Sequence, residues 1–171
     1  MPGSTIPDRV AWAVDQLDLR PDARVLEIGG GPGAAAELVC RRLESGFLLG
    51  IDRSAVAIER STTRNRPFVD AGRLELRRCM LADLEVPDGM FDVAFSVNVN
   101  LFWTSPARPE LDRLYRALRP AGRLHILYGP APGDLSPALA AVRRRLEESA
   151  FGRAEVRRTE RGSEVRATKA A

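Results

Sequence analysis

Apolar residues along this chain recur with two periods, one typical of amphipathic helices and one typical of buried strands. Runs of mostly apolar residues predict five strands, and helical patterns separate each strand from the next. The predicted strands are Arg24–Ile28, Phe47–Ile51, Leu74–Arg78, Phe91–Val97 and Arg123–Tyr128. Parallel strands need crossover helices between them, so this alternation predicts a largely parallel sheet with helices on both faces.

The first predicted helix begins after Thr5, because Thr5 and Asp8 have the spacing of a capping box. The fourth must stop near Arg119, because Pro120 and Gly122 follow it. Five helices are predicted in all. Two are recognised by an apolar face, formed by Val10, Ala13, Val14 and Leu17 in the first helix and by Leu111, Leu114, Tyr115 and Leu118 in the fourth. The second spans Ala34–Leu43, the third runs from the N-cap Ser54 to about Asn65, and the fifth has Ser136 as N-cap and Pro137 at N1.

The end of the chain has a different pattern. Ala154–Arg161 and Glu164–Thr168 flank Gly162-Ser163, which is a two-residue hairpin signal. The predicted fold is therefore an α/β, doubly wound, Rossmann-like sandwich with a seven-stranded, mostly parallel sheet and an antiparallel C-terminal hairpin. Ligands of such sheets bind beyond the carboxyl ends of the strands.

Length and composition agree with one soluble domain, because the chain has 171 residues, of which 44% are hydrophobic and 29% charged. We expect an N-terminal helix or cap (1–22), a nucleotide-binding core (23–150) and the hairpin (151–171). Apolar stretches stay short of the ~18 residues that span a bilayer, and the N-terminus has no apolar region of a secretory signal. A cytoplasmic protein without membrane contact is expected. Cys40 and Cys79 give neither a disulfide framework nor a zinc site, so no metal is predicted.

The net charge of +3 is unevenly distributed. Residues 138–171 carry nine cations and five acids, which could favour nucleic acid or an acidic partner. However, Arg143 and Arg144 lie four residues before Glu147 and Glu148, so both have potential partners on one helix. Nucleic-acid binding is therefore the less favoured interpretation.

A glycine-rich turn, Gly29–Gly33, joins the first predicted strand to its helix. Glycine is needed where the backbone takes positive φ or a ligand approaches the main chain closely. Asp52 closes the second strand 19 residues past Gly33, the usual distance for an acid that binds ribose hydroxyls. Together they indicate an adenosine-containing cofactor. Gly29, Gly31 and Ala34 also fit the dinucleotide pattern G-x-G-x-x-A, so the turn alone leaves a nicotinamide cofactor open.

Five segments in register resemble the class I S-adenosylmethionine (SAM)-dependent methyltransferases. Val25–Gly33 resembles their acid-x-G-x-G-x-G motif, and the terminal hairpin matches their antiparallel seventh strand. The resemblance covers about residues 8–169 and implies SAM as the cofactor and S-adenosylhomocysteine (SAH) as its product. Ala121 departs from the usual glycine. The other matching segments are Gly50–Ser54, Ala82–Leu84, Pro87–Ala94 and Leu118–Arg123.

The resemblance implies that the glycine turn lies against the methionine part of SAM, with Glu27 steering its ammonium group. Asp52 would accept hydrogen bonds from the ribose hydroxyls, and Arg53 would flank the adenine. The remaining cofactor contacts would be Gly29, Gly31 and Gly33 in the turn, Asp83 and the Leu84 N–H at the adenine, and Ser96 to Asn98 at the sulfonium.

The acceptor is expected beyond the fourth and fifth predicted strands. Asn98–Leu101 occupies the place where amino-methylating relatives often carry Asn-Pro-Pro-aromatic, and lacks that motif. No general base is identified in the sequence. None is required, because methyl transfer can proceed mainly by positioning. His125 lies inside a buried strand, so we do not expect it to be catalytic. The candidate substrate-binding residues, for which ordinary packing is the alternative, are Asn98, Asn100, Phe102, Trp103, Tyr128 and Trp12.

The resemblance implies methyl transfer from SAM to an oxygen, nitrogen or carbon atom of a small-molecule acceptor. One alternative is a SAM-binding subunit without catalysis, and another is an RNA or protein methyltransferase that uses the basic C-terminal segment. The segment before the first strand and the loop Gly129–Leu135 are short. Either the first helix covers a small acceptor, or a homodimer partner or another subunit completes the site.

Overall fold

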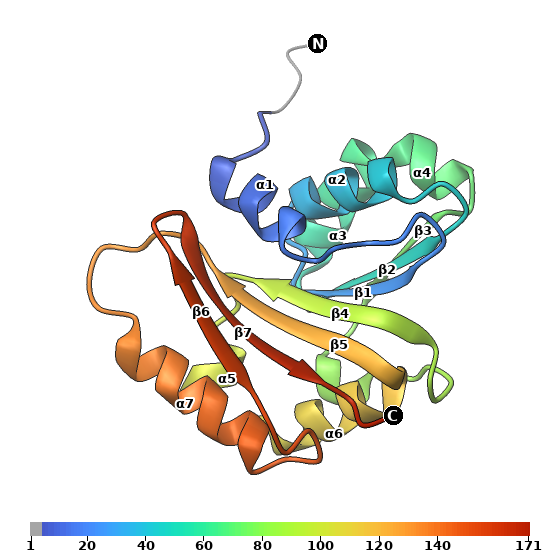
Figure 1. The fold of residues 1–171 in the computed structure, drawn as a ribbon. Coiled ribbons are helices and arrows are strands. Elements are labelled where there is room, and N and C mark those ends of the chain that lie inside the picture. The colour runs from blue at the N-terminus through green and yellow to red at the C-terminus, as the bar shows by residue number, and fades with distance from the viewer. Residues whose placement is uncertain (1–4) are drawn as a thin grey trace.

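A computed structural model describes residues 5–171; residues 1–4 of the predicted N-terminal cap lie outside the described residues. Seven strands of the described chain form a sheet in the order β3-β2-β1-β4-β5-β7-β6 (Figure 1). The first five are parallel, whereas β7 is antiparallel to both of its neighbours, which confirms the predicted fold class. The strands are β1 (Arg24–Ile28), β2 (Phe47–Asp52), β3 (Leu74–Arg78), β4 (Phe91–Val97), β5 (Leu118–Tyr128), β6 (Glu155–Thr159) and β7 (Gly162–Thr168).

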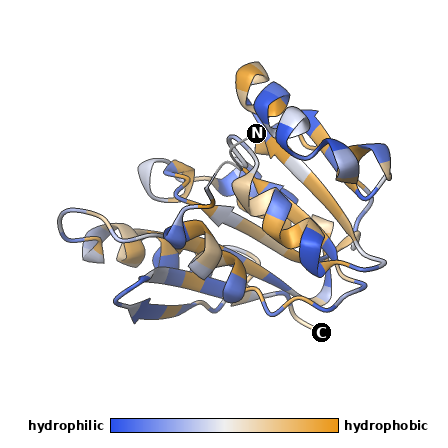
Figure 2. Ribbon diagram, turned by 90° about the horizontal axis from the view of Figure 1, so that it is seen from above, coloured by the Kyte–Doolittle hydropathy of each residue, from blue (hydrophilic) through white to orange (hydrophobic). Residues whose placement is uncertain are grey.

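Helices cover both faces of the sheet, α1 to α4 on one side and α5 to α7 on the other (Figure 1). Each layer buries its own apolar cluster, one including Val14 and Phe95 and the other including Leu114 and Ile126. Figure 2 shows hydrophobic stretches along the central strands and mixed hydropathy along the helices, as expected for amphipathic helices that cover the two faces of a sheet. The helices are α1 (Asp8–Asp15), α2 (Ala34–Arg42), α3 (Ala55–Arg64), α4 (Arg66–Asp70), α5 (Leu101–Thr104), α6 (Arg108–Ala117) and α7 (Ser136–Glu147), with a 3-10 turn, η1 (Leu81–Asp83).

The start of α1 differs from the prediction. Pro7 occupies the N-cap position and no side chain caps the helix, so the capping box of Thr5 and Asp8 does not form. The residue before a proline is disfavoured in the helical region, which delays the helix until Pro7 has been passed. The predicted apolar face is confirmed, because its four residues are buried.

Ser54 caps α3 as predicted, with its Oγ accepting from Ala57 N at 3.2 Å. Two other helix ends, the start of α7 and the end of α6, differ from the prediction. Ser136 is instead the first residue of α7, because the Asp134 carboxylate accepts its backbone N–H at 2.8 Å. Leu118 begins β5 opposite Phe91 rather than ending α6. The short helices α4 and α5 were not predicted, because each is too short to show a helical period.

The terminal hairpin turns two residues earlier than predicted. Gly162 and Ser163 already belong to β7 and pair with Thr159 and Arg158. The reason for glycine at position 162 is packing, because a Cβ atom there would lie 2.4 Å from the ring of Trp12 on α1. Trp12 of α1, only 4% exposed, therefore packs against β7.

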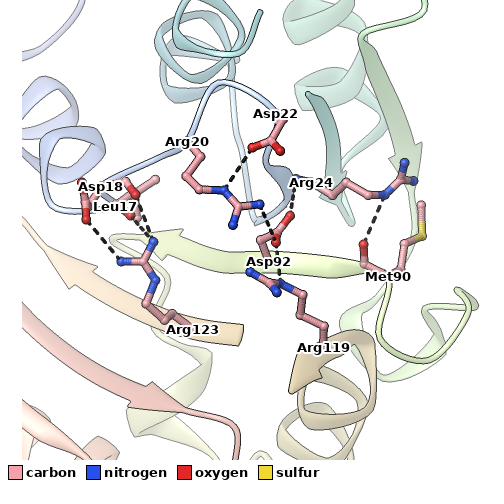
Figure 3. Close-up of polar contacts among 9 residues, drawn as sticks. All are labelled: Leu17, Asp18, Arg20, Asp22, Arg24, Met90, Asp92, Arg119 and Arg123. Carbon is pink, nitrogen blue, oxygen red and sulfur yellow. Dashed lines mark hydrogen bonds and ion pairs between the residues drawn. The ribbon is translucent and has the colours of Figure 1, made fainter. Parts of the chain in front are cut away.

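The amino-terminal edge of the sheet is held by Asp92 on β4 (Figure 3). Its Oδ2 accepts the backbone N–H of Arg24 at 2.7 Å, and its Oδ1 forms ion pairs with Arg20 and Arg119. Nearby, the Arg123 guanidinium donates to the carbonyl oxygens that follow α1, at Leu17 and Asp18 (Figure 3). These contacts lie at the edge opposite the carboxyl ends of the parallel strands. Within residues 5–171, no helix combines the length and apolar character needed to cross a membrane.

Candidate functional site

A cavity of about 470 Å³ opens where the carboxyl ends of β1, β2 and β4 meet. This volume falls in the range of small-molecule and cofactor sites, about 300–1,000 Å³. The cavity lies between the glycine turn, the end of β2, the segment after β3 and the loop after β4. Its lining residues are Ile28, Gly29, Ile51, Asp52, Arg53, Cys79, Met80, Leu81, Asn98, Val99, Asn100, Leu101 and Thr104.

The glycine turn requires glycine at three positions. Gly29, Gly31 and Gly33 have φ of 69°, 53° and 86°, in the left-handed region that side chains rarely adopt. Gly29 N donates to the Ile51 carbonyl at 2.8 Å, which ties the turn to the end of β2. A Cβ atom on Gly29 would also lie 2.7 Å from Val99 Cγ2, so the turn closely approaches the loop after β4.

Asp52 lies beside the glycine turn at the end of β2. Its Oδ2 accepts from Gly31 N at 3.0 Å, and its Oδ1 accepts from Ser54 N at 2.8 Å. These two bonds fix the carboxylate against the cavity. Each oxygen of an ionised carboxylate can accept more than one hydrogen bond, so acceptor capacity remains for a ligand.

Glu27 is almost fully buried below the same turn, with 3% of its surface exposed. Its Oε2 has no hydrogen-bond partner, and a Cβ on Gly30 would lie 3.0 Å from that oxygen. Burial, with a smaller contribution from the Asp52 charge, raises the pKa of Glu27 to about 8. An unpartnered buried carboxyl behind a glycine turn fits a cationic group of a ligand, because such a charge would offset the cost of ionising it.

The segment after β3 places different residues in the cavity from those predicted. Cys79, Met80 and Leu81 line it, and Cys79 N donates to the Asp52 carbonyl at 3.1 Å. Asp83 is exposed and Leu84 fully buried, and neither belongs to the cavity lining. The 3-10 turn η1 begins at Leu81, directly after Met80, and ends at Asp83. The signal in the sequence that could have identified Cys79 to Leu81 as lining residues is their place directly after the third predicted strand.

The loop after β4 forms the opposite wall. Asn98 has φ of 56°, and its Oδ1 accepts from Gly129 N at 2.9 Å. Tyr128, 5% exposed, donates from its hydroxyl to the Val99 carbonyl at 3.2 Å. Asn100 Oδ1 accepts from Trp103 Nε1 at 3.2 Å. The loop is therefore preorganised by side chains of the loop itself and of β5.

The structure brings only some of the candidate acceptor residues to the cavity. Asn98 and Asn100 line it, whereas Phe102 is 1% exposed and packs in the apolar cluster. Trp103 is 38% exposed beside the loop and is not among the lining residues. Ser96, a candidate cofactor contact, is fully buried with an unpartnered Oγ. Val99, Leu101 and Thr104 of the lining were not predicted, and the last two lie on α5, a helix that was itself not predicted.

His125 lies away from the cavity. It is fully buried on β5, and its Nδ1 contacts Glu164 on β7. Burial lowers the pKa of His125, although the hydrogen bond to Glu164 opposes this effect. The predicted burial of His125 within its strand is confirmed, and the absence of a catalytic role stays a prediction.

Comparison with known proteins identifies the family. A family model described as a methyltransferase domain matches residues 25–122, which include the glycine turn, Asp52 and the loop after β4. This chain belongs to that methyltransferase family. The prediction of a class I SAM-dependent methyltransferase is thereby confirmed, together with SAM as the cofactor.

The methyltransferase is 28% identical over 126 residues to the uncharacterized methyltransferase YdaC of Bacillus subtilis (strain 168), covering 74% of this chain and 67% of the relative. A SAM-dependent O-methyltransferase from Thermotoga maritima has the same fold, with a TM-score of 0.76 at 17% identity, over 100% of this chain and 68% of that one. Geranyl diphosphate C-methyltransferase from Streptomyces coelicolor A3(2) was solved with Mg²⁺, geranyl diphosphate and SAH. It gives a TM-score of 0.67 at 16% identity, and the match covers 83% of this chain and 59% of that one.

Proposed function

We propose that this methyltransferase transfers the methyl group of SAM to an oxygen, nitrogen or carbon atom of a small-molecule acceptor. The observation that carries the proposal is the continuity of one cavity from Asp52 and Gly29 to the loop Asn98–Leu101. A cofactor bound along the first wall would present its reactive end to the second. The cavity is large enough for a cofactor and opens on the side where an acceptor could enter.

The buried carboxyl of Glu27 and the glycine turn are proposed to bind the methionine part of SAM. Asp52 is proposed to accept hydrogen bonds from the ribose hydroxyls, since its oxygens are fixed toward the cavity by Gly31 and Ser54. The adenine is then expected beside Arg53 and the segment Cys79–Leu81, which line the cavity next to Asp52. The half-exposed side chain of Met80 offers the base an apolar contact there.

Bound SAM supplies an electrophilic methyl group on its sulfonium. The residues of the chain are proposed to hold the acceptor against that group and to exclude water, since alignment at about 3–3.5 Å accounts for much of such a rate enhancement. Asn98, Asn100 and Thr104 supply polar groups along this wall, and Val99 and Leu101 supply apolar ones. The hydrogen bonds from Tyr128 and Gly129 keep the wall in place.

The arginines of the C-terminal segment favour a small acceptor over RNA. Arg143 pairs with Glu147 at 2.8 Å and Arg166 with Glu155 at 2.7 Å. Arg145 donates to the Phe102 carbonyl at 2.6 Å. These contacts engage positive charge within the protein, which reduces what is available for phosphate.

The test is formation of SAH by the purified chain, incubated with SAM and small acceptors that carry hydroxyl, amine, carboxyl or activated carbon nucleophiles. Acceptor-dependent SAH formation is expected, and its loss in an Asn100→Ala variant that still binds SAH would assign the loop to the acceptor. SAM binding without turnover would favour a non-catalytic subunit. Methylation of RNA that is lost on raising the salt concentration would favour the basic segment instead. Full activity of a monomeric form would exclude a shared site.

A further inference from the structure

A side chain outside the cavity lining holds the glycine turn. Asn65 follows α3 and is fully buried. Its Nδ2 donates to the Gly33 carbonyl at 3.0 Å and to the Ser61 carbonyl at 3.1 Å. The first of these bonds joins residues 32 apart in sequence and crosses from α3 to the turn that precedes α2.

The backbone of Asn65 is fixed as firmly as its side chain. Its N–H donates to the Ser61 carbonyl at 3.0 Å, which ends α3, and its carbonyl accepts from Phe68 N and Val69 N in α4. The junction of two helices therefore sets where the amide points. A side chain anchored on both sides can transmit the position of α3 to the glycine turn.

Gly33 is the residue on which this contact acts. Its N–H donates to the Gly30 carbonyl at 3.1 Å, and its carbonyl accepts from Glu37 N as the first bond of α2. Asn65 adds a second donor to that carbonyl. A Cβ on Gly33 would lie 2.5 Å from Asn65 Nδ2, so the amide fills the space that the missing side chain leaves. The left-handed φ of Gly33 is thus stabilised from outside the turn.

We propose that Asn65 is a positioning residue for the cofactor, which fixes the Gly33 carbonyl and thereby the turn that binds the methionine part of SAM. This inference rests on the proposed contact of the turn with that part of the cofactor. A preorganised loop binds more tightly because it does not have to be ordered when the ligand arrives. Loss of Asn65 should therefore weaken binding of the amino-acid part of the ligand much more than adenosine recognition, because Ser54 N still holds the second oxygen of Asp52 when the contact from Gly31 N loosens.

The test compares two ligands by calorimetry, SAH and 5′-methylthioadenosine, which lacks the amino-acid part. In Asn65→Ala we expect SAH to bind about tenfold more weakly while 5′-methylthioadenosine changes less than about twofold. Asn65→Asp keeps the size of the side chain but removes the donor, and it should change the affinity for the two ligands in the same way as Asn65→Ala. It replaces the alanine variant in the test if that variant does not fold. Hydrogen exchange at the amides of Gly30, Gly31 and Gly33 should rise in both variants.

Ser61→Ala is the matched control. The Ser61 side chain touches the same glycine, since a Cβ on Gly33 would lie 2.3 Å from its Oγ, but that hydroxyl has no partner. Its removal should leave SAH affinity unchanged. Equal weakening of both ligands in the Asn65 variants would assign Asn65 a merely structural role and overturn the proposal, as would unchanged SAH affinity. If the unaltered protein bound neither ligand, the proposed cofactor contacts would fail together with this inference.

Discussion

Asp52 Oδ2 accepts a hydrogen bond from Gly31 N at 3.0 Å, across 21 residues of sequence. The acid that is proposed to bind the ribose therefore also holds the turn that is proposed to bind the methionine. Its second oxygen accepts from Ser54 N, next to the start of α3. One carboxylate thus couples two parts of the cofactor site, and its replacement should affect both.

Asp52→Ala should weaken SAM binding roughly tenfold to a hundredfold, because hydrogen bonds to a charged group contribute about 1.5–3 kcal/mol. Calorimetric titration with SAH measures the change. Ser54→Ala is the control, because it removes the cap of α3 and should cost about 1 kcal/mol of stability without changing SAH affinity. Unaltered affinity in the Asp52 variant would contradict the proposed ribose contact.

Stability should fall as the pH rises, because of Glu27. Its folded-state pKa of about 8 lies above the ordinary 4.5, so between these values the folded chain holds a proton that the unfolded chain has lost. The free energy of unfolding should decrease across this window by up to about 1.4 kcal/mol per pH unit. Urea unfolding at several pH values should show a flatter dependence in Glu27→Gln. Identical slopes in the two proteins would show that Glu27 is already ionised.

Binding of SAM should release a proton below about pH 8 if the ammonium group pairs with ionised Glu27. Calorimetry in buffers of different ionisation enthalpy counts the protons released. We expect release from the unaltered protein and none from Glu27→Gln, which should also bind SAH more weakly. Proton release that persists in the variant would point to another group.

Asp83→Ala should leave SAH affinity within about twofold of the unaltered protein, which corresponds to less than about 0.4 kcal/mol of binding free energy. Asp83 is exposed and does not line the cavity, whereas Met80 does. Met80→Ala should weaken binding, since it removes apolar contact beside the expected adenine position. A large loss of affinity in Asp83→Ala would support the adenine contact that the resemblance implies.

His125→Gln should retain SAH binding. Burial lowers the pKa of His125 below its ordinary value of 6.5 in the folded chain. As the pH falls through 6.5, the unfolded chain gains a proton that the folded chain resists, so stability is lost toward acid. Unfolding at falling pH should therefore show less acid sensitivity in the glutamine variant. Loss of SAH binding in a folded variant would contradict a purely internal role.

Asp92→Ala should destabilise the fold by about 1–3 kcal/mol, because the Arg24 N–H and two guanidinium groups would lose their shared partner. Asp22 is the matched control, since it pairs with Arg20 at the surface and is 64% exposed (Figure 3). Its replacement should have little effect, as is usual for exposed ion pairs. Thermal unfolding compares the two variants, and SAH affinity should remain unchanged in both.

The sequence by itself determined most of the elements and the edge of the sheet at which the cavity lies. Strands, most helices and the glycine turn follow from hydrophobic period and backbone conformation, which act over a few residues. For the same reason, the bounds of β1, β3 and β4 agree with the prediction. Asp52 follows from its place at the end of the second strand, 19 residues past Gly33.

Only the tertiary structure decided which side chains meet. Gly162 is needed for Trp12 on another element rather than for a turn, and Met80 enters the cavity where Asp83 was expected. The contact from Asn65 to Gly33 joins residues 32 apart, and that from His125 to Glu164 joins residues 39 apart. Such contacts depend on how helices and strands pack together, and the periodicity of a single segment contains no information about the side chain that lies opposite it.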